Sequence, residues 1–361
     1  MSKEAESRAP GVGSVAGMPG TTRRVFLGGI SGIGASVALG CSSEQKPKAG
    51  ETKLPAGGTM PRRKLGRTGV EVGLLGLGGY HIGSAESQEE SARIIHRAMD
   101  NGVTFMDNCW DYHKGKSEEW MGKALADGRR QKVFLMTKTD GHTKEACAAQ
   151  IDQSLRRLAT DYIDLVQIHE VIRPTDPDKV FAPGGAVEAL VEAKKAGKIR
   201  FLGFTGHKSP DIHLAMLKKA DEMGFAFDTA QMPLNVFDHH FESFEKKVLP
   251  VLVQKNMGVL GMKPLAAGAI LKTGVVNATQ CLHYAMNLQT SVVITGCDSM
   301  GVLEQALAAA YSFKPLPEDQ LASLLQSTAA LAQGGKHERF KTSGDFDGTE
   351  QNPHWLTTSE V

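Results

Sequence analysis

Strand-like and helix-like segments alternate along the chain from Met60 onward. Short apolar runs rich in β-branched residues are separated by amphipathic segments of about ten to eighteen residues. In 87–102, for example, Ala92, Ile95 and Met99 share one helical face, and a glycine ends the helix. Eight strand–helix units over about 250 residues predict an α/β fold of the (β/α)8 TIM-barrel type. The strand-like runs are 72–79, 104–109, 133–138, 162–170, 199–207, 228–235, 258–266 and 291–297.

An open doubly wound sheet is the main alternative to the barrel, because it also alternates strands and helices. It would need a glycine-rich fingerprint after an early strand, and the stretch GLGGYHIG at the first run lacks that spacing. A further helical segment at 317–335 exceeds the eightfold count and predicts an extra C-terminal helix. We therefore expect the barrel over 59–335, followed by a polar C-terminal tail over 336–361.

Charge and cysteine content exclude several classes of protein. The formal net charge is +1, with 41 basic and 40 acidic residues, so nothing predicts electrostatic attraction to nucleic acid. Five cysteines lie far apart without a CxxC pair, which argues against a disulfide framework or a structural zinc site. The sequence predicts no metal site.

The N-terminal segment has the composition of an export signal rather than of a folded domain. Arg23 and Arg24 stand in the motif TTRRVFL, and a glycine-rich, mildly apolar run without charge follows them. This pattern resembles a twin-arginine signal, which we place at 1–41, with a possible lipoprotein box ending at Cys41. Residues 42–58 are then a flexible linker. The resemblance implies contact with the twin-arginine export machinery and a periplasmic or lipid-anchored product, with Cys41 as the only membrane attachment.

Polar side chains gather where the predicted strands end, which is where barrel enzymes place their active sites. Asp107 ends the second run and Tyr112 follows it, while Lys138 ends the third and His169 the fourth. A buried lysine needs a counter-charge, and Asp107 on the adjacent strand can supply it. A neighbouring ammonium should also lower the pKa of Tyr112 and make its hydroxyl a better proton donor. Such a site suits protonation of a carbonyl oxygen.

These residues make the chain similar to the aldo-keto reductases over nearly all of its length from Met60 to Gln333. The Asp-x4-Tyr motif of that family stands here as Asp107 and Tyr112, its strand-three lysine as Lys138, and its strand-four histidine as His169. The resemblance implies hydride transfer between NADP(H) or NAD(H) and a carbonyl or alcohol substrate, with these four residues as the catalytic set. It places the cofactor at Thr205, His207, Gln231, Met262, Lys263, Pro264, Leu265, Gly296, Asp298 and Gln305, and the substrate at Tyr80 and Trp110.

The cofactor positions depart from the family pattern at several points. The usual Ser-Asn pair after strand five is Thr205-Gly206, and the aromatic residue that stacks on the nicotinamide is Met262. A thioether can pack on a ring, although less specifically. No basic residue follows the last strand, where the family often binds the 2′-phosphate of NADPH, and Asp298 stands there instead. A strong preference for NADPH is therefore not expected.

Two other classes of function fit parts of the sequence. Some family members are accessory subunits of channels, so a non-catalytic nicotinamide-binding sensor or subunit is one alternative. A metal-dependent barrel hydrolase is the other, because His81, His169 and His207 all fall at strand ends. Such hydrolases usually carry two histidines as His-x-His on the first strand, and GGYHIG has one.

Overall fold

The computed structural model describes residues 58–360. The predicted signal at 1–41, with Arg23, Arg24 and Cys41, and nearly all of the linker at 42–58 lie outside this range. The strands are β1 (Arg62–Lys64), β2 (Glu71–Gly73), β3 (Leu75–Gly78), β4 (Phe105–Asp107), β5 (Phe134–Thr139), β6 (Ile163–Ile168), β7 (Ile199–Thr205), β8 (Thr229–Pro233), β9 (Gly258–Met262) and β10 (Val292–Gly296).

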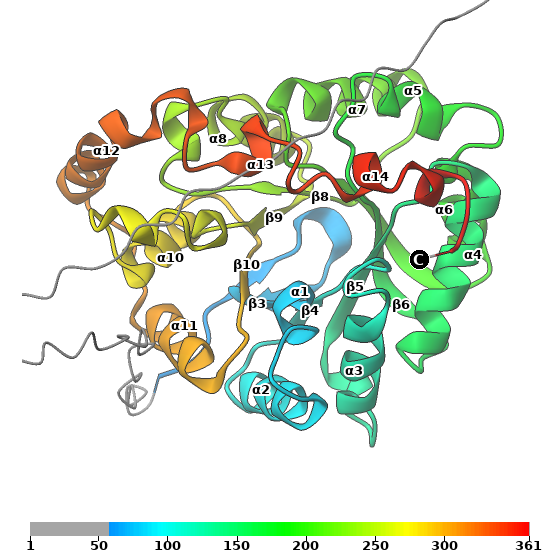
Figure 1. The fold of residues 1–361 in the computed structure, drawn as a ribbon, viewed down its shortest axis with the longest axis horizontal. Coiled ribbons are helices and arrows are strands. Elements are labelled where there is room, and N and C mark those ends of the chain that lie inside the picture. The colour runs from blue at the N-terminus through cyan, green and yellow to red at the C-terminus, as the bar shows by residue number, and fades with distance from the viewer. Residues whose placement is uncertain (1–57, 361) are drawn as a thin grey trace, which may run out of the picture. The chain divides into compact units, whose positions relative to one another are not determined.

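Eight of these strands close into one barrel, in which every neighbouring pair is parallel. The order around the barrel is β10-β3-β4-β5-β6-β7-β8-β9, so each strand lies beside the next along the chain. Helices surround the barrel in Figure 1. The predicted (β/α)8 barrel is therefore confirmed, with one difference at its start. The run expected as a single strand at 72–79 is divided, because 71–73 pairs with β1 and only 75–78 enters the barrel.

The helices have the following bounds: α1 (Gly79–Ile82), α2 (Gln88–Asp100), α3 (Lys116–Ala124), α4 (Lys144–Arg157), α5 (Asp176–Phe181), α6 (Ala186–Lys195), α7 (Pro210–Glu222), α8 (Phe244–Lys247), α9 (Leu249–Gln254), α10 (Ala278–Asn287), α11 (Met300–Ser312), α12 (Glu318–Ala332), α13 (Arg339–Thr342) and α14 (Gly348–Gln351). In α2 the Ser87 side chain accepts a hydrogen bond from the Glu90 amide and caps the helix. Its apolar face then buries Ile94, Ile95 and Ala98.

The antiparallel hairpin of β1 and β2 fills the amino end of the barrel. Leu65 and Val72 are fully buried there and belong to one apolar cluster with Phe105 and Phe134, which point inward from β4 and β5. The rings of Phe105 and Phe134 stack with their centroids 5.2 Å apart. Since this end is packed with apolar side chains, the polar chemistry of the barrel is confined to the opposite, carboxyl end.

The extra C-terminal helix is present as α12, and the chain beyond it does not behave as a free tail. Residues 336–360 cross the barrel from α12 toward α4, as the red segment of Figure 1 shows. Phe340 and Asp347 are buried, at 1% and 0% exposure. The Glu170 carboxylate, just after β6, accepts hydrogen bonds from the amides of Gly348 and Thr349 at 2.9 and 2.7 Å. We name residues 336–360 the covering segment.

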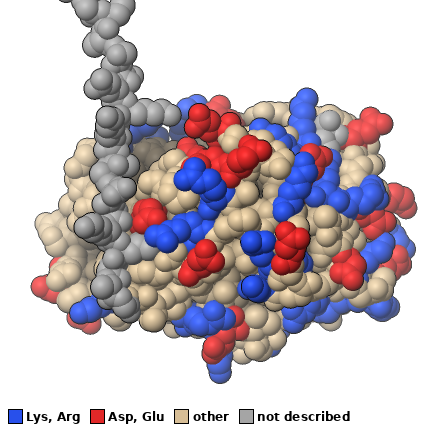
Figure 2. All heavy atoms as spheres, turned by 90° about the horizontal axis from the view of Figure 1, so that it is seen from below, with Lys and Arg blue, Asp and Glu red and all other residues tan. Residues whose placement is uncertain are grey.

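The surface carries both signs of charge. Figure 2 shows lysine and arginine side chains interspersed with aspartate and glutamate over the face in view, as the formal net charge of +1 leads one to expect. Among residues 58–360, none of the helices is both long and apolar enough to span a membrane.

Candidate active site

Three adjacent strands bring the predicted catalytic residues together at the carboxyl end of the barrel. Asp107 is the last residue of β4, Lys138 lies in β5, and His169 directly follows β6. The Lys138 ammonium, 1% exposed, donates hydrogen bonds to Asp107 Oδ1 at 2.5 Å and to the Asn108 carbonyl at 2.7 Å. The expected ion pair between Asp107 and Lys138 therefore forms, and it is buried.

Tyr112 completes this chain of polar contacts from the loop after β4. Its hydroxyl accepts a hydrogen bond from Lys138 Nζ at 3.3 Å, and its ring lies 6.0 Å from the ring of His169, centroid to centroid. The next two residues, His113 and Lys114, have positive φ angles of 53° and 58°, so the loop turns sharply just after the tyrosine. The loop thus holds the hydroxyl between β5 and β6.

The pKa of Tyr112 differs in direction from the sequence expectation. Burial is the main cause that raises this pKa well above its ordinary value, and the Asp107 carboxylate raises it further. The Lys138 ammonium, which is paired with Asp107, does not outweigh these effects, so the predicted lowering is wrong. Tyr112 is therefore protonated throughout the physiological pH range, which is the state that a proton donor needs.

His169 has acidic neighbours on one ring nitrogen. Its Nδ1 lies 2.8 Å from Asp140 Oδ1, 3.2 Å from Cys109 Sγ and 3.8 Å from Asp111 Oδ1. Burial, the largest effect, lowers the pKa of His169, while Asp111 acts in the opposite direction. Burial also raises the pKa of Asp140 to about 7 and that of Asp111 to about 6. A histidine that is neutral near pH 7 can donate from one nitrogen and accept at the other.

Three side chains from β7, β8 and the loop after β7 lie where the nicotinamide was expected: Thr205 ends β7, His207 follows it, and Gln231 lies in the middle of β8. Thr205 is 1% exposed, and its hydroxyl oxygen has no hydrogen-bond partner in the described part of the chain. Gln231 instead donates to Asp107 Oδ2 at 3.2 Å and accepts from Gln167 at 2.8 Å. The buried Thr205 hydroxyl therefore has a free hydrogen-bonding capacity for a ligand.

The covering segment contacts three basic side chains on this side of the barrel mouth, His207, Lys208 and Lys263. His207 Nε2 lies 3.0 Å from Asp347 Oδ1, and the neighbouring Lys208 also pairs with Asp347. The ammonium of Lys263 lies over the rings of Phe340 and Phe346, at 5.5 and 5.1 Å from their centroids. Burial lowers the pKa of Lys263 to about 8.

The other predicted cofactor positions lie further around the mouth. Met262 ends β9 and is half-buried, and Pro264 and Leu265 follow in the same turn. Gly296 ends β10, and a Cβ atom added to it would lie 2.0 Å from the His81 ring, so His81 already fills the space above it. Two positions are exposed: Asp298 in the loop after β10, and Gln305 on α11.

The two predicted substrate-pocket residues differ sharply in position. Tyr80, on α1, is 53% exposed, and its ring packs edge-on against Tyr112 with the centroids 5.4 Å apart. It can line the entrance to the site. Trp110 is fully buried, donates to Gln153 Oε1 at 2.7 Å and packs against Trp355 of the covering segment. The ring of Trp110 is thus enclosed by protein in this structure, and the substrate contact at Trp110 stays a prediction.

The histidines that suggested a metal-dependent hydrolase do not converge. His169 contacts Asp140, His207 contacts Asp347, and His81 rests on Gly296. One different group of potential metal ligands is present among the described residues: Cys109, Asp111, Asp140 and His169. This group was not predicted from the sequence.

Sequence reasoning also missed Asp140 and Glu170. Asp140 lies two residues after Lys138, and Glu170 directly follows His169. The rule that selected Lys138 and His169 at strand ends could therefore have included them. Glu170 has a positive φ of 44°, a conformation unusual for a side chain of its kind, and it binds the covering segment. Nothing in the sequence pattern indicated that contact, because its partners lie about 180 residues away.

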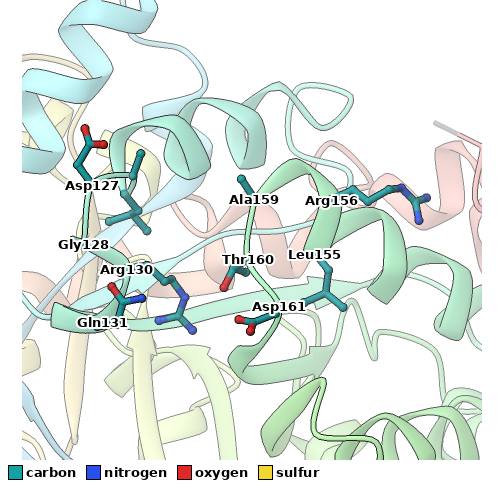
Figure 3. A pocket seen from close by; sticks show the side chains of 11 residues that line it. Asp127, Gly128, Arg130, Gln131, Leu155, Arg156, Ala159, Thr160 and Asp161 are labelled. Carbon is teal, nitrogen blue, oxygen red and sulfur yellow. The ribbon is translucent and has the colours of Figure 1, made fainter.

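A separate pocket of about 630 Å³ lies at the other end of the barrel. Figure 3 shows it between the segments that precede β5 and β6, with Arg130, Gln131, Thr160 and Asp161 on its walls. Segments that lead into the strands belong to the amino end of a (β/α)8 barrel, whereas Tyr112 and Lys138 belong to the carboxyl end. This pocket is thus not part of the candidate active site.

Comparisons with known proteins agree with this architecture. The sequence model of the aldo/keto reductase family matches residues 74–280. Aldo-keto reductase YhdN of Bacillus subtilis is 30% identical over 228 residues, which cover 58% of this chain and 64% of that protein. L-galactose dehydrogenase of Arabidopsis thaliana is 26% identical over 314 residues, which cover 83% of this chain and 92% of that protein.

A solved structure gives the same fold. Aldo-keto reductase AKR11C1 from Bacillus halodurans, in its holo form, superposes with a TM-score of 0.63 at 22% identity, covering 77% of this chain and 99% of that one. At this identity the likeness concerns the fold alone. The family match, by contrast, spans more than half of the chain. The chain therefore belongs to the aldo/keto reductase family.

Proposed function

We propose that the chain is an NAD(P)-dependent oxidoreductase that reduces an aldehyde, ketone or sugar-like carbonyl, with Tyr112 as the proton donor. The observation that carries the proposal is the buried chain of contacts from Asp107 through Lys138 to the Tyr112 hydroxyl, with His169 on the next strand. Family membership supports the same reaction class. The name of L-galactose dehydrogenase makes sugars and related polyols a sensible first group of substrates to test.

In this proposal each of the four residues has a distinct task. Tyr112 gives its hydroxyl proton to the carbonyl oxygen as hydride arrives at the carbon. Lys138 stabilises the tyrosinate that forms, because its ammonium lies 3.3 Å from that oxygen. Asp107 keeps the ammonium in place through the 2.5 Å contact. His169 orients the carbonyl oxygen from the neighbouring strand.

The cofactor would bind across the ends of β7 to β10. The free hydroxyl of Thr205 fits a polar partner such as the nicotinamide amide, and the ammonium of Lys263 fits an anionic group. The cofactor supplies the hydride. His207 Nε2 is bonded to Asp347 of the covering segment, so a cofactor contact at this nitrogen would replace that bond.

The proposal is tested by titrating purified protein with NADH and NADPH and then assaying a panel of carbonyl compounds. We expect both cofactors to bind, with NADPH no more than about tenfold tighter, a difference of roughly 1.4 kcal/mol, because exposed Asp298 stands where a cation would bind the 2′-phosphate. A hundredfold preference for NADPH would contradict this. Binding without turnover across the panel would instead favour the sensor or accessory-subunit alternative.

Cofactor affinity should depend on the protonation of Lys263. Because its pKa is lowered to about 8, the ammonium is charged at pH 7 and is lost as the pH rises toward 9. We expect the affinity for either cofactor to fall over this range in the wild type and to be nearly constant in Lys263→Gln. Fluorescence titration at several pH values measures the affinity of the wild type and of the variant. If the affinity of Lys263→Gln falls with pH as steeply as that of the wild type, this role for Lys263 is excluded.

We also propose export by the twin-arginine route, on the basis of the motif around Arg23 and Arg24. That route carries folded proteins, so a nicotinamide cofactor could be loaded before export. Arg23→Lys combined with Arg24→Lys should leave the protein in the cytoplasm with its signal uncleaved. Cell fractionation and mass measurement of the mature chain test this. Normal export of the double variant would show that the motif is not a signal, and an unmodified Cys41 in the exported protein would exclude the lipid anchor.

A further inference from the structure

Four potential metal ligands lie side by side next to Tyr112, and the proposed reduction needs only one of them. They are Cys109, Asp111, Asp140 and His169, and we name them the strand-end cluster. One ligand atom from each lies within 4.8 Å of all the others. Around His169 Nδ1 the separations are 2.8 Å to Asp140, 3.2 Å to Cys109 and 3.8 Å to Asp111. With bonds of about 2.0–2.3 Å, tetrahedral zinc separates its ligand atoms by about 3.3–3.6 Å, a distance in the middle of this range.

The carboxylates of the cluster retain oxygen atoms without partners. Asp140 is 0% exposed, and its Oδ2 has no hydrogen-bond partner in the described part of the chain. Asp111 Oδ1, the oxygen that faces His169, also lacks a hydrogen-bond partner there, although the Asp111 side chain is 16% exposed. Leaving a buried carboxylate oxygen without a donor is costly, and a bound cation would remove that cost. These two atoms are an independent indication that the cluster binds something.

The charge balance indicates that the ligand is a cation. Two carboxylates and a thiol meet here, and the ammonium nearest to them, that of Lys138, is bonded to Asp107 at 2.5 Å. Three acidic ligands around one imidazole are a typical environment for a divalent metal ion, whose charge offsets the burial of the anions.

We propose that the strand-end cluster binds a divalent metal ion of the zinc class through Cys109 Sγ, His169 Nδ1 and one carboxylate oxygen each from Asp111 and Asp140. Thiolate and imidazole ligands select zinc over calcium or magnesium, which prefer an all-oxygen environment. The ligands come from the ends of β4, β5 and β6, so the ion links three strands of the barrel.

Metal binding would also fix the tautomer of His169. With Nδ1 bound to the ion, the ring proton must reside on Nε2, whichever reaction the barrel performs. If the proposed reduction is correct, the imidazole then presents a fixed donor to the substrate oxygen. The metal site itself does not depend on that reaction, and its test below uses binding rather than turnover.

The full-length protein is first depleted of metal with a chelator and then titrated with Co²⁺, a spectroscopic substitute for Zn²⁺. We expect one equivalent of Co²⁺ to bind with a thiolate-to-cobalt charge-transfer band and strong visible absorption typical of tetrahedral cobalt. One equivalent of Zn²⁺ should abolish both. Cys109→Ser should remove the charge-transfer band, whereas Cys281→Ser, which changes a cysteine buried to 1% exposure on α10, should keep it.

A band that persists in Cys109→Ser would place the metal at another thiol, such as Cys41, and overturn the proposal, as would the absence of stoichiometric binding in the wild type. A second measurement guards against misfolded variants. Zn²⁺ should raise the melting temperature of the depleted wild type and of Cys281→Ser, but not that of Asp140→Asn, whose amide keeps the shape of the carboxylate. An equal rise in Asp140→Asn would exclude that residue as a ligand.

Discussion

Tyr112→Phe should abolish most carbonyl reduction while leaving the fold and the cofactor affinity nearly unchanged. The substitution keeps the ring, which packs against Tyr80 and lies beside His169, and removes only the hydroxyl. Loss of a positioned general acid typically lowers the rate by about 10²–10⁴. Lys138 keeps its bonds to Asp107 and to the Asn108 carbonyl, so the free energy of unfolding should change by no more than about 1 kcal/mol. Steady-state kinetics, cofactor titration and thermal melting measure the three quantities.

Tyr162→Phe is a matched control for this experiment. Tyr162 stands just before β6, at the amino end of the barrel, where its ring lies over the Arg130 guanidinium. Its loss of a hydroxyl should leave the rate at the wild-type level. If Tyr112→Phe stays active within a factor of about three, another group donates the proton, and His169 and His113 are the candidates to vary next.

The barrel and the buried ion pair could be predicted from sequence because both follow from local rules. Strand-like runs alternate with helical periodicity, and the carboxyl ends of parallel strands must face one end of a barrel. Asp107 and Lys138 lie at or near the carboxyl ends of adjacent strands, so their contact followed from the strand order. The division of the first run was missed because 72–78 is a continuous stretch of apolar residues and glycines, which periodicity cannot separate.

Contacts between distant parts of the chain could not be predicted in the same way. Trp110 is enclosed because Trp355 packs on it, and Glu170 is satisfied by amides of the covering segment. These partners lie in a stretch whose polar composition resembles that of a tail. The predicted direction of the Tyr112 pKa shift was wrong for a related reason. That direction depends on how deeply the hydroxyl is buried and on whether Lys138 is already paired, and a sequence motif shows neither.

Lys138→Met should impair both turnover and stability, which distinguishes it from Tyr112→Phe. Removing the ammonium leaves the Asp107 carboxylate, which is 4% exposed, without its counter-charge. Breaking a buried pair in this way costs about 3–5 kcal/mol, which corresponds to a fall in melting temperature on the order of 10 °C. Turnover should fall at least about 10²-fold, because the tyrosinate formed in the reaction is no longer stabilised.

A second substitution separates the two effects of Lys138. Asp107→Asn combined with Lys138→Met removes the unpaired charge, and the amide that replaces the carboxylate can still bond to Gln231, whose side chain lies 3.2 Å from Asp107 Oδ2 in the wild type. The double variant should therefore regain most of the lost stability and none of the activity. Arg130→Met, which breaks the buried pair with Asp164 at the amino end, is the matched control. The Arg130→Met variant should be less stable than the wild type. At temperatures below its own melting temperature, however, its turnover should equal that of the wild type. Recovery of activity in the double variant would mean that Lys138 acts only through Asp107 and has no direct part in the proton transfer.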